Sequence, residues 1–86
     1  REVEEVLYEH PAVAEAAAIG APHAVLGEVV KAVVVLRPGA KADALTLKRY
    51  CSERLAGYKV PQIFEFRDAL PRNPSGKVVK RELTGE

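Results

Sequence analysis

The spacing of apolar residues along the chain predicts a succession of short helices and strands. The first nine residues place Val3, Val6 and Leu7 at i, i+3 and i+4 between glutamates, which is the pattern of a short amphipathic helix. His10-Pro11 is expected to end this helix, because proline disfavours the helical conformation of the residue before it. His10 is interpreted as a structural residue at this corner, since no second histidine or carboxylate cluster accompanies it in the sequence.

Two strands are predicted next. The first runs from Val13 to Ile19 and, if unbroken, places Val13, Ala17 and Ile19 on one face, although its alanines are weak strand formers. Residues 29–36 are β-branched and almost continuously apolar, which predicts the central strand of a sheet. We expect the two strands to pair antiparallel across a loop formed by residues 20–27.

A helix and a third strand complete the pattern. Asp43 is a plausible helix N-cap, and Gly57 is the expected C-terminal stop. Residues 62–66 alternate as an edge strand does. Cys51 lies on the buried stripe of the helix and is interpreted as core packing. That stripe has four residues at helical spacing: Leu47, Tyr50, Cys51 and Leu55. Together the elements predict a small α+β domain with a mostly antiparallel sheet of about three strands and two to three helices.

Composition narrows the class of protein. The 86 residues suit one small domain, and the net charge of +1 provides no strong field for nucleic acid or membrane. One cysteine excludes an internal disulfide and favours a reducing compartment. No signal-peptide layout or apolar run of about 20 residues is present, so we expect a cytoplasmic protein without a membrane span. The chain starts on charged residues of an uncapped helix, which suggests a piece of a longer protein.

The stretch from Leu70 to Leu83 carries the candidate chemistry. Pro71 and Pro74 stiffen a loop, Gly76 permits a positive φ, and Lys77 follows as a cation on that loop. Local chemistry alone leaves two interpretations open, a solvated turn or a lysine presented to an anion. A phosphate-binding P-loop is excluded, because Pro71 stands where it needs its first glycine and a valine follows the lysine. The sequence contains no nucleophile–base pair, carboxylate pair or metal-ligand cluster.

Residues 71–81, Pro-Arg-Asn-Pro-Ser-Gly-Lys-Val-Val-Lys-Arg, resemble the last signature motif of the adenylate-forming enzymes: a proline, four variable residues, Gly-Lys and then a basic residue. This superfamily contains acyl- and aryl-CoA synthetases, peptide-synthetase adenylation domains and luciferases. Three further segments agree in order with its C-terminal domain: residues 2–13, residues 20–34 and residues 51–61. Two departures are His23, where members often carry Asp, and Asp43, where Thr or Ser often caps the helix. Neither touches the proposed catalytic lysine.

The resemblance implies that residues 1–86 are a single C-terminal lid domain whose partner is a large N-terminal domain that binds ATP, with Mg, and a carboxylic acid. Lys77 would be the catalytic residue for acyl-adenylate formation, on a loop positioned by Pro71, Pro74 and Gly76. Rotation of the lid would then support thioester formation with CoA, with Tyr58 and Lys59 as candidate CoA contacts. The resemblance implies no metal site in this domain, no cofactor bound to it alone and no activity of its own.

Three alternatives stay open beside an acyl-CoA ligase of fatty acid metabolism. The lid could belong to a peptide-synthetase adenylation domain, in which the acceptor is a carrier protein. It could also be a free-standing, non-enzymatic binding module of the same fold. Binding of nucleic acid through the basic second half is disfavoured, because the charge excess is small and aromatic stacking platforms are lacking.

Overall fold

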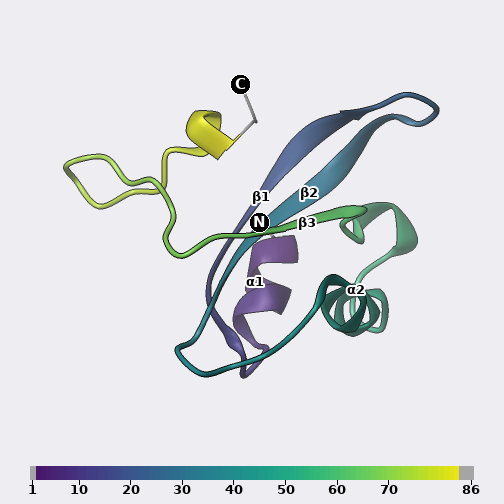
Figure 1. Ribbon diagram of the computed structural model, residues 1–86. Coiled ribbons are helices and arrows are strands. Elements are labelled where there is room, and N and C mark those ends of the chain that lie inside the picture. Colours follow the sequence, from purple (N-terminus) through teal and green to yellow (C-terminus); the bar gives the residue numbers. More distant parts are fainter. Residues whose placement is uncertain (1, 84–86) are drawn as a thin grey trace.

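A three-stranded sheet with two helices against one face forms the domain, as the computed structural model shows for residues 2–83 (Figure 1). Arg1 and residues 84–86, which the expected first helix and C-terminal tail include, lie outside the described residues. The elements in chain order are α1 (Glu2–Tyr8), β1 (Val13–His23), β2 (Gly27–Leu36), α2 (Ala44–Ser52), the 3-10 turn η1 (Gly57–Lys59), β3 (Ile63–Phe66) and the 3-10 turn η2 (Lys80–Leu83).

The sheet has the order β1-β2-β3, so the valine-rich β2 is central as predicted. β1 and β2 pair antiparallel, which confirms the predicted pairing. β3 pairs with β2 in parallel, from Lys31 opposite Ile63 to Val34 opposite Phe66. A parallel neighbour needs a crossover connection, and the segment that carries α2 provides it. The α+β class and the three strands are confirmed, and the sheet is mixed.

β1 differs from its prediction in its length and in the faces of the sheet on which its side chains lie. It continues through Gly20 to His23, so the connection to β2 is the three residues 24–26 and not the longer loop expected. An irregularity in register between Val13 and Glu15 also breaks the alternation of side chains. Val13 therefore packs on the helix side of the sheet, whereas Ala17 and Ile19 lie on the opposite side. The predicted common face of these three residues is wrong.

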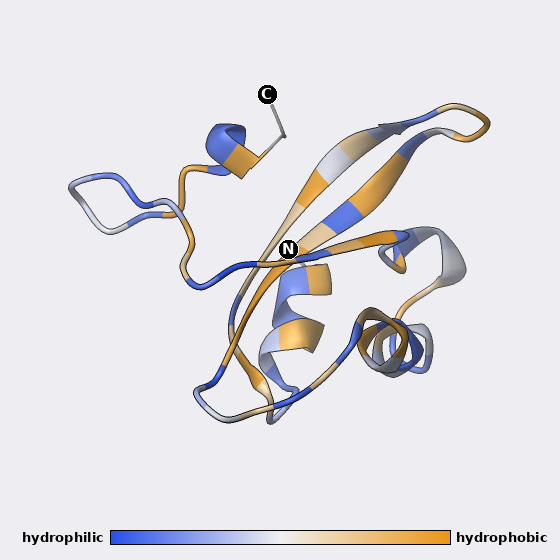
Figure 2. Ribbon diagram, viewed as in Figure 1, coloured by the Kyte–Doolittle hydropathy of each residue, from blue (hydrophilic) through white to orange (hydrophobic). Residues whose placement is uncertain are grey.

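Both faces of the sheet are covered, by different parts of the chain. On one face, α1 and α2 pack their apolar residues, including Leu7 and Leu47, against β1 and β2. On the other face, Leu70, Val78 and Leu83 of the C-terminal segment pack against valines of β2. In Figure 2 the strands between these layers carry much of the hydrophobic colour, while the loop that projects beyond them is largely hydrophilic. The C-terminal segment is thus one wall of a core, not an unattached tail.

α2 begins as predicted and ends earlier than predicted. The Asp43 carboxylate accepts a hydrogen bond from the Thr46 N–H at 2.8 Å, which confirms the cap. The helix stops at Ser52, five residues before Gly57, which instead opens η1. Leu55 still reaches the core, because its N–H bonds to the Cys51 carbonyl in one further turn.

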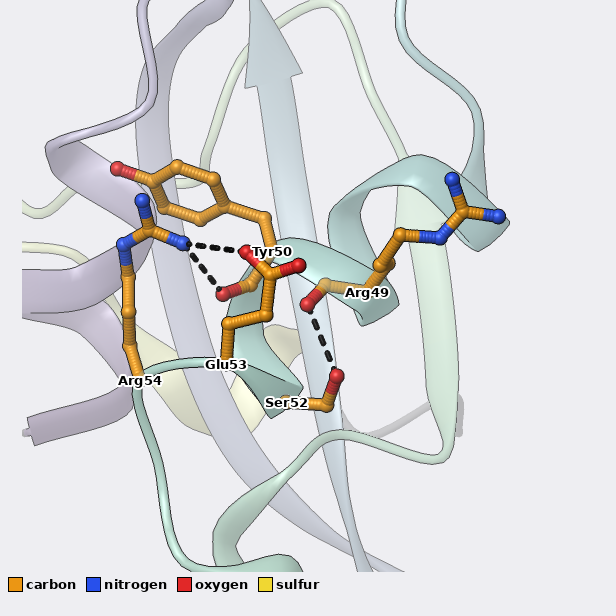
Figure 3. A network of polar contacts seen from close by, with 5 residues as sticks. All are labelled: Arg49, Tyr50, Ser52, Glu53 and Arg54. Carbon is orange, nitrogen blue, oxygen red and sulfur yellow. Dashed lines mark hydrogen bonds and ion pairs between the residues drawn. The ribbon is translucent and has the colours of Figure 1, made fainter.

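A polar network covers this early end of α2 (Figure 3). The Arg54 guanidinium lies 3.6 Å from the centroid of the Tyr50 ring and donates to the Tyr50 carbonyl at 3.0 Å and to Glu53 at 3.3 Å. The Ser52 hydroxyl donates to the carbonyl of Arg49, whose own side chain points away from this group. The Tyr50 carbonyl at this helix end is thus paired by the Arg54 side chain, whereas the Arg49 carbonyl accepts from both the Ser52 hydroxyl and the Glu53 N–H.

Cys51 and His10, which the sequence analysis interprets as structural residues, both make packing or hydrogen-bond contacts within the fold. Burial of Cys51 in the first core raises the pKa of its thiol, which keeps it protonated, as expected of a packing residue. His10 accepts a hydrogen bond from the Ala12 N–H at 3.0 Å through Nδ1, and its ring meets the Tyr50 ring edge-on. It fixes the corner between α1 and β1.

Candidate functional site

Lys77 lies on an exposed loop that projects beyond the sheet (Figure 1). The loop rises from a two-stranded stem, in which Arg72 pairs with Val78 and the Val79 N–H donates to the Pro71 carbonyl at 2.9 Å. Gly76 has φ +86°, the left-handed conformation that its lack of a Cβ permits. Among the described residues, the Lys77 ammonium has no hydrogen-bond or ion-pair partner.

Asn73 organises the inside of this loop. Its carboxamide oxygen accepts hydrogen bonds from the Ser75 N–H at 3.1 Å, the Ser75 hydroxyl at 2.8 Å and the Lys77 N–H at 3.0 Å. Its own N–H donates to the Lys77 carbonyl at 2.9 Å, and its carbonyl accepts from the Gly76 N–H at 2.9 Å. The backbone around Lys77 is therefore fixed by hydrogen bonds in addition to the prolines.

Two ion pairs attach the lysine-bearing segment to the rest of the fold. The Arg72 guanidinium donates to the Gly76 carbonyl at 2.7 Å and to the Glu15 carboxylate of β1 at 2.6 Å. Beyond the loop, Lys80 lies 2.7 Å from the Glu4 carboxylate of α1, which also accepts from the Ala18 N–H at 2.8 Å. Burial raises the pKa of Glu4, but the hydrogen bonds from Lys80 and Ala18 outweigh it, so the pKa is lowered overall.

The connector residues Tyr58 and Lys59 lie in η1, far from Lys77 in the fold. Tyr58 is 81% exposed, which is unusual for an aromatic side chain without a partner surface. Lys59 donates to the Glu2 carboxylate of α1 at 2.5 Å and lies 5.6 Å from the Tyr58 ring centroid. Its pKa is raised, chiefly by the hydrogen bond to Glu2, so the ammonium is charged at neutral pH.

Tyr58 borders two hollows beside the hairpin of β1 and β2. One, of about 430 Å³, lies between Tyr58, Val3, Gly20 and Glu28, and the other, of about 320 Å³, shares Tyr58 and Glu28. At the hairpin tip, His23 accepts hydrogen bonds from the N–H groups of residues 25 and 26 through Nδ1. His23 therefore makes the side-chain-to-backbone turn that an Asp at this position makes.

The structure thus keeps two groups of candidate residues apart. In Figure 1 the loop at 71–78 projects to the left of the sheet, and the segment of η1, between α2 and β3, lies to the right. No residue of the loop at 71–78 lines either hollow beside Tyr58. Lys77 and the pair of Tyr58 and Lys59 therefore lie on separate parts of the domain surface.

Three residues of the lysine loop network were not singled out by sequence reasoning: Arg72, Asn73 and Glu15. Asn-Pro-Ser-Gly is a sequence typical of a side-chain-capped turn, so the role of Asn73 had a readable signal. Glu15 had none, because it lies 57 residues from Arg72 in the chain.

Residues 2–83 contain no group of three or more potential metal-ligating side chains. Within the same range, no helix has the length and apolar character that crossing a bilayer requires.

Comparison with known proteins gives a consistent family. Residues 2–77 match the model of the AMP-binding enzyme C-terminal domain. A long-chain-fatty-acid–CoA ligase of Bacillus subtilis (strain 168) is 51% identical over 86 residues, which are all of this chain and 15% of that protein. The fatty acid–acyl-carrier-protein ligase ScoC of Streptomyces coeruleorubidus is 48% identical over 95% of this chain and 16% of its own length.

A solved structure agrees in fold. The o-succinylbenzoate CoA synthetase MenE of Bacillus subtilis, in complex with its acyl-adenylate intermediate, superposes with a TM-score of 0.90 at 46% identity, over 99% of this chain and 17% of that one. The chain thus spans about one sixth of the proteins that it matches. It belongs to the family of AMP-binding enzyme C-terminal domains found in acyl-CoA ligases and other adenylate-forming enzymes.

Proposed function

We propose that this domain is the mobile C-terminal lid of an ATP-dependent acyl-CoA ligase, and that Lys77 serves its adenylation step. The observation that carries the proposal is the placement of Lys77: an exposed ammonium, without a partner among the described residues, on a loop braced by Asn73 and Arg72. A lysine braced in this way, in a domain that corresponds to 15% of an acyl-CoA ligase relative, fits a group delivered to a site on another domain.

In the first half-reaction, a carboxylate oxygen of the acid attacks the α-phosphorus of ATP, the bond to the β-phosphate oxygen breaks, and pyrophosphate leaves. Both reactants are anionic, so a cation that bridges them lowers the barrier and aligns the attack. Lysine suits this role as a compact charge on a flexible stem. Pro71, Pro74 and Gly76 give the loop its shape, and closure over the large domain excludes water from the acyl-adenylate. ATP, with Mg, and the acid would be bound by that large domain.

In the second half-reaction, a thiol sulfur attacks the acyl carbon, the bond to AMP breaks, and the thiol proton leaves with a base or water. The lid would rotate to present its other face, where Tyr58 borders the hollows beside Glu28 and Lys59 follows Tyr58 in η1. An exposed aromatic ring and a neighbouring cation are suited to the nucleotide end of CoA. The separation of this face from Lys77 supports a lid that serves the two steps in turn.

The acceptor has a second candidate. ScoC, which is 48% identical, is a fatty acid–acyl-carrier-protein ligase, so a carrier-protein thiol is the alternative to CoA. Thioester formation assayed separately with CoA and with a phosphopantetheinylated carrier protein distinguishes the two.

The test of the lysine is Lys77→Ala in the full-length enzyme that carries this domain. We expect the rate of adenylation, measured as pyrophosphate release, to fall by about 10²- to 10³-fold. This is the cost of removing one group that stabilises transition-state charge. Thioester formation from supplied acyl-adenylate should stay within about twofold, because Lys77 has moved away by that step. Lys41→Ala is the matched control, since Lys41 is also exposed but lies in the loop between β2 and α2. Equal loss of both half-reactions in Lys77→Ala contradicts the proposal.

A further inference from the structure

The orientation of the Asn73 carboxamide is fixed by its neighbours. Its Oδ1 faces the N–H groups of Ser75 and Lys77, at 3.1 and 3.0 Å. Backbone N–H groups only donate, so the atom that faces them is the acceptor oxygen and not the amide nitrogen. The Ser75 hydroxyl completes the set of three donors at 2.8 Å. The Oδ1 atom of Asn73 thus accepts hydrogen bonds from three donors on the inside of the lysine loop.

These bonds bear directly on the backbone of Lys77. Asn73 and Lys77 are joined twice, by the main-chain bond to the Lys77 carbonyl and by the side-chain bond from the Lys77 N–H. Between them lies Gly76, at φ +86°, whose freedom would otherwise let the loop take several shapes. The Arg72 guanidinium holds the Gly76 carbonyl and is itself held by Glu15 of β1. The backbone from which the Lys77 side chain leaves the loop is therefore held in a fixed position relative to the sheet.

We infer that Asn73 is a positioning residue for Lys77, which preorganises the loop so that the ammonium reaches the reacting phosphate and carboxylate. The inference rests on the proposed function of Lys77 and deepens it. In the motif, Asn73 occupies one of the four variable positions between Pro71 and Gly76, so the motif alone does not assign it this role.

Preorganisation matters here because the loop is exposed and short of apolar contacts. Without the acceptor, three donors lose their protein partner and turn to water, which stabilises other loop shapes. A displacement of about 1 Å of a catalytic group can cost about 10²-fold in rate. Val78 and Leu83 still anchor the segment to the sheet, so the loss should be local.

The experiment compares Asn73→Leu with Asn73→Asp in the full-length enzyme. Leucine keeps the approximate size of the side chain and removes the acceptor, whereas aspartate keeps an oxygen at the same place. Single-turnover pyrophosphate release, at saturating ATP and acid, should fall about 10- to 100-fold in Asn73→Leu and stay within about threefold in Asn73→Asp. The KM for ATP and the rate of thioester formation from supplied acyl-adenylate should change less than about threefold in both Asn73 variants. ATP is proposed to bind to the larger domain, and thioester formation is proposed to use the other face of the lid. Ser52→Ala, which removes a side-chain-to-backbone bond on α2, is the control and should leave all rates unchanged.

Three results would overturn the inference: wild-type adenylation in Asn73→Leu, an equal fall of both half-reactions, or an Asn73→Asp variant as slow as Asn73→Leu. Lys77→Ala, measured in parallel, separates the two proposals. If Lys77→Ala adenylates normally, the proposed function itself fails. If only Lys77→Ala is slow, the role of Lys77 stands and that of Asn73 is refuted.

Discussion

Lys59 and Glu2 lie 57 residues apart in the chain, and their Nζ and Oε1 atoms are 2.5 Å apart. The pair joins the connector η1 to the start of α1. The ammonium proposed to meet CoA is thus already occupied in this structure. A phosphate that binds Lys59 must compete with the Glu2 carboxylate, and both groups are partly exposed, so the pair is weak enough to exchange.

This competition makes a prediction about CoA affinity. In the full-length enzyme, Glu2→Gln removes the competing charge and should lower the KM for CoA by about two- to fivefold, the range that an exposed ion pair allows. Lys59→Ala should raise it, and adenylation should be unaffected in both variants. Steady-state kinetics with CoA as the varied substrate checks the effect. An unchanged KM in Lys59→Ala would remove Lys59 from the CoA site.

The network around Glu4 predicts a dependence of stability on pH. Because folding lowers the pKa of Glu4, its ion pair stabilises the domain above the ordinary pKa of 4.5 and the stabilisation is lost as the pH falls through the lower folded value. The pKa of Glu65 is lowered in the same way by hydrogen bonds from Lys31 and Arg67. Urea unfolding of the 86-residue chain should therefore show a falling free energy of unfolding below about pH 4.5.

Glu4→Gln tests the origin of that slope. The variant keeps a carbonyl oxygen for the Ala18 N–H and loses the charge facing Lys80. Its free energy of unfolding should fall less steeply between pH 5 and pH 3, roughly the range in which carboxylates titrate. The contribution of Glu65 remains. A variant with the full pH dependence of the wild type would show that Glu4 is not a source of it.

Two leucines of the same helix provide a matched test of the core. Leu47 is fully buried, whereas Leu45 is 65% exposed. Leu47→Ala should lower the free energy of unfolding by about 2–5 kcal/mol, because it removes buried methyl groups and leaves a cavity. Leu45→Ala should change it by less than about 0.5 kcal/mol. Chemical denaturation of both variants, with unchanged m-values, measures the difference. Similar losses in the two would place the core on the wrong face of α2.

The isolated 86-residue chain should form no acyl-AMP. Lys77 provides one cation, and the sites for ATP and the acid are proposed to lie on the larger domain, since this chain corresponds to 15% of an acyl-CoA ligase relative. ATP–pyrophosphate exchange with a mixture of carboxylic acids is a sensitive check. Exchange above background by the purified chain would contradict a lid that acts only in a site on another domain.

The sequence predicted those parts of the fold that depend on local spacing. The stripe of Val3, Val6 and Leu7 is buried as expected, and so is the valine run of β2. The parallel pairing of β3 could not be read in the same way, because its alternation of side chains is the same in parallel and antiparallel ladders. The direction of β3 depends on the end of the sheet at which the chain re-enters after α2, and that position is set by the packing of α2 on the sheet.

Two errors have equally specific causes. The register shift between Val13 and Glu15 lies where the alternation of residue types is weak, because alanines flank Glu15 on both sides. Glycine is the common helix stop and predicts an end at Gly57, but α2 ends at Ser52, where the Arg54 side chain donates to the Tyr50 carbonyl. For the site, local residues predicted a rigid loop around Lys77. The attachment to Glu15 depends on a distant strand and was not predictable.

The Glu4 carboxylate has a consequence beyond its charge. β1 is an outer strand of the sheet, and the hydrogen bond from its Ala18 N–H to Glu4, with Lys80 on the same oxygen, occupies part of its outer edge. Open edges invite another chain to add as a fourth strand, and charged groups placed there prevent it. The lid proposed above moves against its larger domain during catalysis, and Glu4 and Lys80 are placed to hinder such strand addition while β1 is exposed.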